Sequence, residues 1–68
     1  MSVVKVIEIK VSSTKSFEDA IKKGIERTRK TIEGIRAAWI KEQEVKIDER
    51  GSISEYRVLM KITFEVKD

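Results

Sequence analysis

The C-terminal part of the chain shows a strict two-residue hydrophobic period. From Ile53 onward, six even-numbered positions in a row are apolar: Tyr56, Val58, Met60, Ile62, Phe64 and Val66. Successive side chains of a β-strand point to opposite faces of a sheet, so the pattern predicts a long strand with one apolar face. Alternation also runs from Ile35 to Ile47, and the polar segment 48–52, Asp-Glu-Arg-Gly-Ser, predicts a turn between the two. This half of the chain therefore predicts a hairpin of two long strands.

The N-terminal half predicts one more strand and one helix. The segment Val3 to Val11 is rich in β-branched residues, as strands are. Ser16 can cap a helix, Asp19 lies at the third helical position of a capping-box pattern, and apolar residues then recur every three or four positions. Gly34 is placed to end this helix, which would span about seventeen residues. We expect a single domain over residues 1–68 with the order strand, helix, strand, strand.

The lengths of these elements predict an oligomer. A strand of about thirteen residues spans ~43 Å. A helix of about seventeen residues spans only ~26 Å. The helix cannot cover the sheet, so apolar side chains and unpaired strand edges would remain in water unless other subunits cover them.

Composition excludes several classes of function. The chain has no cysteine and no histidine, so disulfides, thiolate metal sites and the commonest catalytic base are absent. We therefore do not expect an enzyme. Lysine and arginine exceed the acidic residues by only three charges and are interleaved with them, which argues against a nucleic-acid partner. No apolar run approaches a membrane span of ~20 residues and no signal peptide is recognisable, so no membrane association is expected and the predicted location is cytoplasmic.

Two stretches carry a resemblance to a known family. The stretch "VVKVIEIKVSSTKSFEDAIKKGIERTRKTIEGI" resembles the first half of the dodecins, and "EYRVLMKITFEVKD" resembles their closing strand. The resemblance implies an α+β fold with a β-α-β-β protomer, whose three-stranded antiparallel sheet wraps around one helix. It also implies a hollow dodecamer without enzymatic turnover. Typical dodecins hold pairs of flavins between symmetry-related tryptophans, with a glutamine at the polar edge of the ring.

The flavin positions of the family are altered in this chain. Aligning the common family form "NIRWFEVVEQ" on "GIRAAWIKEQ" puts the stacking tryptophan at Ala37, while Trp39 lies two residues later on the same strand face, displaced by ~6.6 Å. The glutamine position is Arg57, and two arginine positions near the cofactor phosphate are Glu44 and Glu65. These altered positions together argue against ordinary flavin-mononucleotide binding. Any flavin in this chain would be held weakly by Trp39, Arg57 and Ala37, with riboflavin favoured over flavin mononucleotide because the carboxylates would repel its phosphate.

A second branch, the calcium dodecins, is closer in these positions. That branch lacks the stacking tryptophan and has "IR" followed by small residues, an "EQ" pair and a "YR" pair, all of which this chain has. Calcium takes six to eight oxygen ligands, so a site would have to be assembled on a symmetry axis. Its candidate ligands are Glu42, Glu44 and Asp48.

Simpler interpretations stand beside these. Trp39 is expected to pack mainly against a neighbouring subunit, and Arg57 and Lys61 are expected to form cross-strand or intersubunit ion pairs with Glu42, Glu44 or Glu65. Capping explains the serine-rich segment before the helix without a bound anion. Two function classes remain open: a particle that binds and stores a flavin or a metal ion, and a structural or interaction oligomer that has lost flavin binding.

Overall fold

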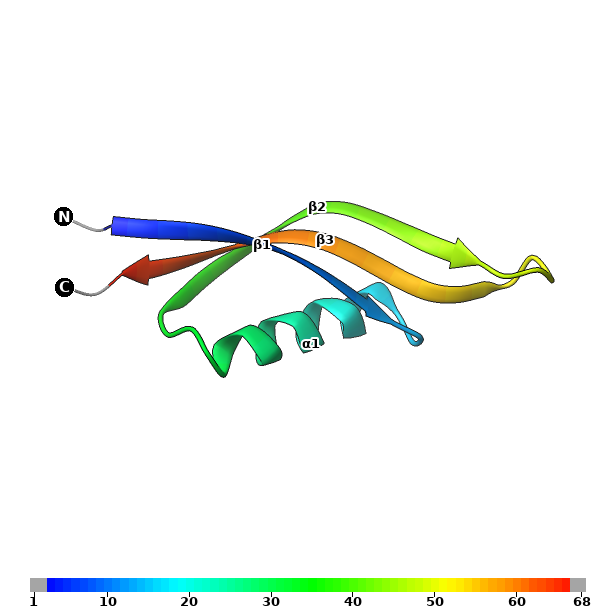
Figure 1. Cartoon of the computed structure of the whole chain (residues 1–68), viewed down its shortest axis with the longest axis horizontal. Coiled ribbons are helices and arrows are strands. Elements are labelled where there is room, and N and C mark those ends of the chain that lie inside the picture. Colours follow the sequence, from blue (N-terminus) through cyan, green and yellow to red (C-terminus); the bar gives the residue numbers. More distant parts are fainter. Residues whose placement is uncertain (1–2, 67–68) are drawn as a thin grey trace.

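The computed structural model describes residues 3–66 and confirms the predicted order of elements. A three-stranded antiparallel sheet in the order β1-β3-β2 carries one helix on one of its faces (Figure 1). The elements are β1 (Val3–Ser13), α1 (Phe17–Arg29), β2 (Ile35–Ile47) and β3 (Ile53–Val66). The predicted α+β class and β-α-β-β topology are therefore correct.

The core lies between α1 and the even-numbered side chains of β3. Val58, Met60 and Ile62 are fully buried there, together with Ala20 of the helix. Gly24 allows the helix to come this close, because a Cβ atom at this position would lie 2.5 Å from the Met60 methyl carbon. The alternation that predicted β3 thus reflects burial of one face against a single helix.

The other face of the sheet, called the open face here, is covered by no element within residues 3–66. It carries the odd-numbered side chains of β3 and their cross-strand partners in β1 and β2. On β3 these residues are Arg57, Leu59, Lys61, Thr63 and Glu65. Every candidate site residue on the strands faces this side.

Two irregularities in β2 decide which of its residues reach the open face. The β2–β3 register shifts at Arg36 and again at Lys41, each of which is an extra residue relative to β3. Ala38 and Ile40 pack against the core before the second shift, whereas Val45 lies on the helix side after it. Each extra residue reverses the alternation, as β-bulges do.

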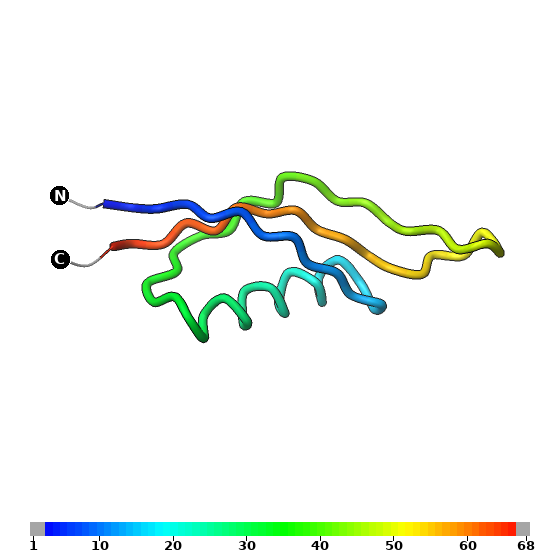
Figure 2. Tube along the Cα trace, in the orientation of Figure 1, coloured from blue at the N-terminus to red at the C-terminus, as the bar shows by residue number. Residues whose placement is uncertain are grey.

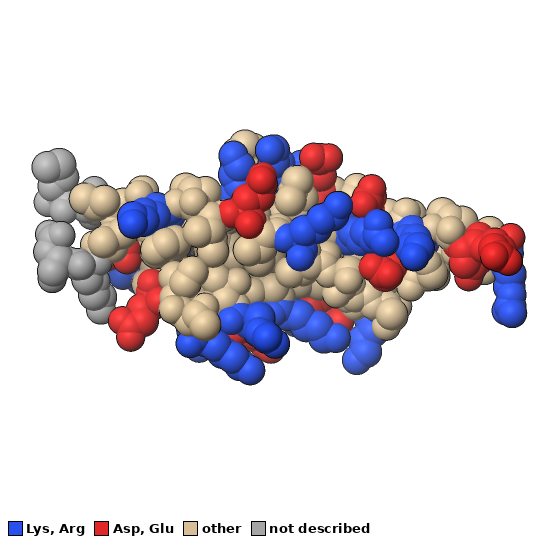
Figure 3. Space-filling view, viewed as in Figure 1, with Lys and Arg blue, Asp and Glu red and all other residues tan. Residues whose placement is uncertain are grey.

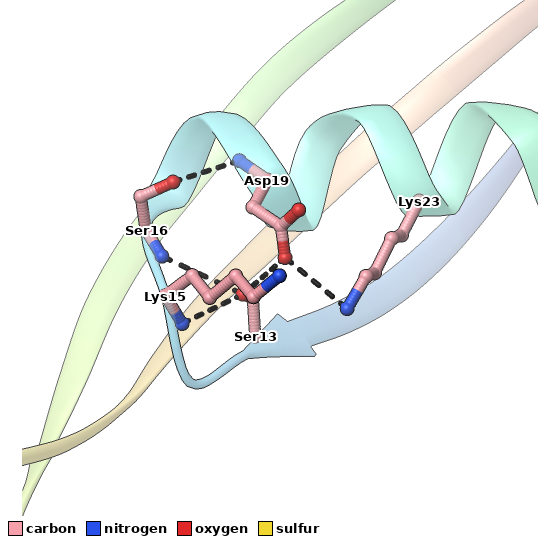
Figure 4. Close-up of polar contacts among 5 residues, drawn as sticks. All are labelled: Ser13, Lys15, Ser16, Asp19 and Lys23. Carbon is pink, nitrogen blue, oxygen red and sulfur yellow. Dashed lines mark hydrogen bonds and ion pairs between the residues drawn. The ribbon is translucent and has the colours of Figure 1, made fainter.

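The predicted start of the helix is correct, and Ser13 adds to it. Ser16 is the N-cap residue and its hydroxyl accepts a hydrogen bond of 2.9 Å from the Asp19 N–H. The Asp19 carboxylate does not complete the capping box; it accepts a bond of 2.5 Å from the Ser13 hydroxyl and pairs with Lys23 at 3.2 Å (Figure 4). The hydrogen bond from Ser13, together with Lys23, holds the pKa of Asp19 below its ordinary value of 3.8.

The predicted end of the helix is wrong. The helix ends at Arg29, well before Gly34, and the chain turns through hydrogen bonds from the N–H groups of residues 31 and 32 to the Thr28 carbonyl. The Thr28 hydroxyl donates to the Gly24 carbonyl, a competing bond that weakens a helix interior. Gly34 has φ of 78° and its carbonyl accepts the N–H of Glu65, so it begins the entry into β2.

The molecule is too elongated for an isolated small domain. Its extents are 52 × 20 × 13 Å, and its radius of gyration is 14.1 Å, compared with about 11 Å for a compact chain of this length. The β2–β3 hairpin projects beyond α1 at one end, while the start of β1 and the end of β3 lie side by side at the other (Figures 1 and 2). The accessible surface is 5325 Å², which exceeds by about 900 Å² the area expected for a folded monomer of this mass.

Candidate functional site

The only tryptophan lies exposed on the open face. The side chain of Trp39 is 63% exposed, and Ala37 lies two residues earlier on the same face of β2. The Lys61 ammonium lies 5.6 Å from the centroid of the indole ring, in cation–π contact with it. The structure therefore brings Ala37 and Trp39 together on one surface, as predicted, and places a cation over the ring.

Arg57 lies farther along the same face and does not join Trp39. Trp39 pairs with Lys61, and Arg57 precedes Lys61 by four positions on β3, a separation of about 13 Å. The Arg57 guanidinium lies 3.6 Å from Glu44 and 3.2 Å from Glu55. Its hydrogen bond holds the pKa of the Glu55 carboxyl below the ordinary value of 4.5. Arg57 is thus engaged within its own chain.

A small hollow surrounds the Arg57–Glu44 pair. Its volume is about 120 Å³, and its lining residues are Lys10, Glu42, Gln43, Glu44, Arg57 and Leu59. The Glu44 carboxylate is approached by Arg57 at 3.6 Å and by Lys10 at 3.8 Å. Within residues 3–66, Glu42 forms no ion pair and no side-chain hydrogen bond, so it is the carboxylate of the hollow that a ligand could engage without displacing a cation.

The two carboxylates expected to repel a phosphate are both paired. Besides the contacts of Glu44, the Arg36 guanidinium lies 3.1 Å from Glu65. A cation within about 4 Å largely offsets the field of a carboxylate at the distance of a ligand. The expected preference for riboflavin over flavin mononucleotide is therefore weaker than the residue types alone suggest.

The three candidate calcium ligands do not meet within one protomer. Glu42 and Glu44 lie on the open face, whereas Asp48 begins the β2–β3 turn and its carboxylate accepts the N–H groups of Arg50 and Ser52 at 2.9 and 3.0 Å. Across residues 3–66 no three acidic, histidine or cysteine side chains form a cluster that could hold a metal ion. A calcium site from these residues would need several copies of the chain, as the sequence predicted, and it stays a prediction.

Sequence reasoning missed the role of Lys61 over the indole ring and that of Lys10 beside Glu44. Both contacts depend on the pairing register of strands that are distant in the sequence. Lys61 faces Trp39 only because of the register shift at Arg36, and Lys10 approaches Glu44 across the central strand. The sequence shows only that Lys61 and Lys10 lie on the polar faces of their strands.

The described part of the chain contains no helix that is long and apolar enough to cross a membrane.

Comparisons with known proteins agree with this geometry. The profile of the family described as Dodecin matches residues 3–67. The calcium dodecin of Mycobacterium tuberculosis is 36% identical over 67 residues, which cover 98% of this chain and 93% of the relative.

Solved structures show the same fold over the whole chain. A single-residue mutant of the Thermus thermophilus dodecin superimposes with a TM-score of 0.92 at 29% identity, covering 100% of both chains. The M. tuberculosis calcium dodecin, described as a calcium-chelating antigen with a novel calcium-binding site, gives a TM-score of 0.83 at 35% identity, covering 97% of this chain and 93% of that one. The sequence profile, the identity to a curated relative and the shared backbone lead to one conclusion: this chain belongs to the dodecin family.

Proposed function

We propose that this protein is a non-enzymatic homo-oligomeric particle, a hollow dodecamer, that binds and stores a small ligand on the open face of its sheet. The observation that carries the proposal is the largely exposed Trp39 ring on that face. An exposed indole in a row of charged side chains costs free energy in water unless a ligand or another subunit covers it.

Surface area supports the oligomer. Within residues 3–66, only four hydrophobic residues are fully buried. Five aliphatic side chains at the two ends of this part of the structure are about half exposed: Val3, Val4, Val6, Ile47 and Ile53. The excess surface of about 900 Å² per chain is close to the ~800 Å² that each partner buries in a standard protein interface. Light scattering should therefore give the mass of a dodecamer of 7.9 kDa chains, and a folded species of 7.9 kDa would contradict the proposal.

A flavin is the first candidate ligand. Stacking on an aromatic side chain contributes ~1 to 3 kcal/mol in nucleic-acid complexes. Trp39 alone would thus supply far less than the ~8 kcal/mol of a micromolar complex, so we expect a micromolar or weaker affinity. Lys61 lies over the ring and has to move aside, which lowers that affinity further. Riboflavin and flavin mononucleotide should bind similarly, with a small preference for riboflavin.

Quenching of flavin fluorescence tests this binding directly. Each flavin is titrated into the purified apo-oligomer, and the same titration is repeated with Trp39→Phe and Trp39→Ala variants. A smaller ring stacks more weakly and a methyl group not at all, so affinity should fall in that order. Equal affinity of all three proteins would exclude Trp39 as the platform.

Calcium is the second candidate, favoured by two observations. The relative with 36% identity is named calcium dodecin, and Glu42 has a carboxylate without an ion-pair partner in the described chain. Hard cations bind carboxylate oxygens, and several copies of Glu42 around a symmetry axis would supply them. Calorimetric titration with calcium should give heat that disappears in a Glu42→Gln variant of unchanged mass.

The alternative is a structural oligomer that has lost flavin binding. It predicts no flavin quenching and no calcium heat, together with a Trp39→Ala assembly that comes apart at lower temperature. Trp39 would then serve as a subunit contact, an interpretation that its 63% exposure also allows.

A further inference from the structure

A groove runs between α1 and the outer edge of β1, on the opposite side of the molecule from β2. Its volume is about 560 Å³. Apolar and small groups from both elements form its floor, namely Ile9, Val11 and Gly24. The charged residues along it are four cations, Lys10, Lys23, Arg27 and Lys30, and one carboxylate, Glu26.

Part of this positive charge is uncompensated. Lys23 pairs with Asp19 and Lys10 approaches Glu44, but Arg27 and Lys30 form no ion pair with any residue in the range 3–66. In Figure 3 a row of basic side chains lies along the side of the molecule where α1 lies, and further basic side chains lie over the strands among acidic ones. A partner for this groove should therefore carry exposed negative charge.

The groove also borders an unpaired strand edge. β1 is an outer strand, so the backbone groups on its outer side pair with no strand of the described chain. Such an edge readily accepts an extended segment from another chain. The preferred occupant is consequently an acidic, extended segment with apolar side chains.

The hairpin tip of this chain, residues 47–53, combines acidic and apolar side chains on a turn that the extended strands β2 and β3 carry. Ile47 and Ile53 face each other across the two strands and are 54% and 49% exposed. Between them lie two carboxylates and one guanidinium, Asp48, Glu49 and Arg50, and acidic atoms dominate this end of the molecule in Figure 3. The tip lies beyond the N-terminal end of α1, pointing away from the groove of its own chain, so it can reach only the groove of another copy (Figure 1).

We propose that the groove between α1 and β1 receives the hairpin tip of a second copy of this chain. Ile47 and Ile53 contact the apolar floor, and Glu49 faces Arg27 and Lys30. The inference rests on the oligomer proposed above and specifies one of its contacts. Groove and tip are different surfaces, so the contact is heterologous and each copy uses both, which in a closed assembly generates rings.

Charge exchange tests the contact. Arg27→Glu and Glu49→Arg should each raise the concentration at which the assembly dissociates, on the order of tenfold, because like charges then face each other at the interface. The double variant should return to the wild-type value. Arg29→Glu is the matched control, since it makes the same charge change on α1 outside the groove lining.

Disulfide trapping gives an independent measurement. The chain has no cysteine, so a variant with Arg27→Cys and Glu49→Cys should form intermolecular disulfides upon mild oxidation, whereas one with Arg29→Cys and Glu49→Cys should not. An assembled protein that shows neither trapping nor charge rescue would overturn the hairpin contact and leave the proposed oligomer standing. Single variants that weaken assembly without rescue by the double variant would mean that another surface, or an acidic peptide of a different protein, occupies the groove, which also overturns it. A monomeric wild type would overturn both proposals.

Discussion

Replacing Lys61 with glutamine should tighten riboflavin binding two- to fivefold. The Lys61 ammonium lies 5.6 Å from the centroid of the Trp39 ring, which is 63% exposed. A cation–π contact at such an exposed site contributes about 0.5 to 1 kcal/mol. A flavin that stacks on the ring has to displace the ammonium and loses this amount, and 1.4 kcal/mol corresponds to a tenfold change in affinity, so removing the contact gives about two- to fivefold.

The assay is a titration of the apo-oligomer with riboflavin, followed by quenching of flavin fluorescence. Lys41→Gln is the matched control, because Lys41 also reaches the open face but pairs with Glu8 at 3.4 Å and does not cover the ring. Flavin mononucleotide should gain less than riboflavin from Lys61→Gln, since its phosphate loses a nearby positive charge. Weaker riboflavin binding in Lys61→Gln would refute the reasoning and make Lys61 a ligand contact. Absence of quenching in both proteins would refute the Trp39 platform itself.

Two further predictions concern the protomer. Gly24→Ala should lower the thermal unfolding temperature. Overpacking against the Met60 methyl carbon at 2.5 Å costs about 1 to 3 kcal/mol, whereas the higher helix propensity of alanine returns only up to about 1 kcal/mol. An unchanged unfolding temperature would mean that the Met60 side chain moves aside freely. The folded-state pKa of Asp19 is lowered, so the stability that its ionised carboxylate contributes is present above pH 3.8 and is lost as the pH falls below this value. Ser13→Ala removes the hydrogen bond and raises that pKa, so the variant should lose less free energy of unfolding on acidification, as followed by circular dichroism. Identical acid-unfolding profiles of the two proteins would argue against the Ser13 contribution.

The strands could be predicted closely because one physical cause fixes their pattern. The bounds of β2, Ile35 and Ile47, and the start of β3 at Ile53 agree with the sequence, since each strand buries one face and exposes the other. The turn could be predicted equally well. The Asp48 carboxylate accepts hydrogen bonds from two backbone N–H groups, and Gly51 adopts a φ of 83°. These features depend on neighbouring residues alone.

The end of the helix and the bulges depend on contacts that sequence patterns do not record. Apolar periodicity continues past Arg29 to Ile32, yet threonine side chains and the entry into β2 end the helix earlier. The register shifts at Arg36 and Lys41 keep Ala38, Ile40 and Val45 on the helix side of the sheet. A change of apolar positions from even-numbered Ile40 to odd-numbered Val45 was the one sequence signal of the second bulge.

That second bulge has a consequence for function, because it places Glu42 and Glu44 on the same face as Trp39. The candidate flavin platform and two of the three candidate calcium ligands thus belong to one surface. Glu8, Glu44 and Glu65 on this surface each have a cation of their own chain within 4 Å. Two open faces can therefore approach each other without burying unpaired carboxylates at these three positions.

Glu42 is the exception on this surface, since no cation of the described chain pairs with it. When subunits assemble over the open face, burying this carboxylate alone would cost several kcal/mol, so a cation has to accompany it. A lysine or arginine of a neighbouring subunit would satisfy it in the structural oligomer, and a metal ion would satisfy it in the calcium-binding particle. The choice between these two functions therefore depends on what neutralises Glu42, and Glu42→Gln is the substitution that separates them. If the assembly depends on bound calcium, Glu42→Gln should stabilise it after calcium has been removed. If Glu42 pairs with a cation of a neighbouring subunit, Glu42→Gln should weaken the assembly both with and without calcium.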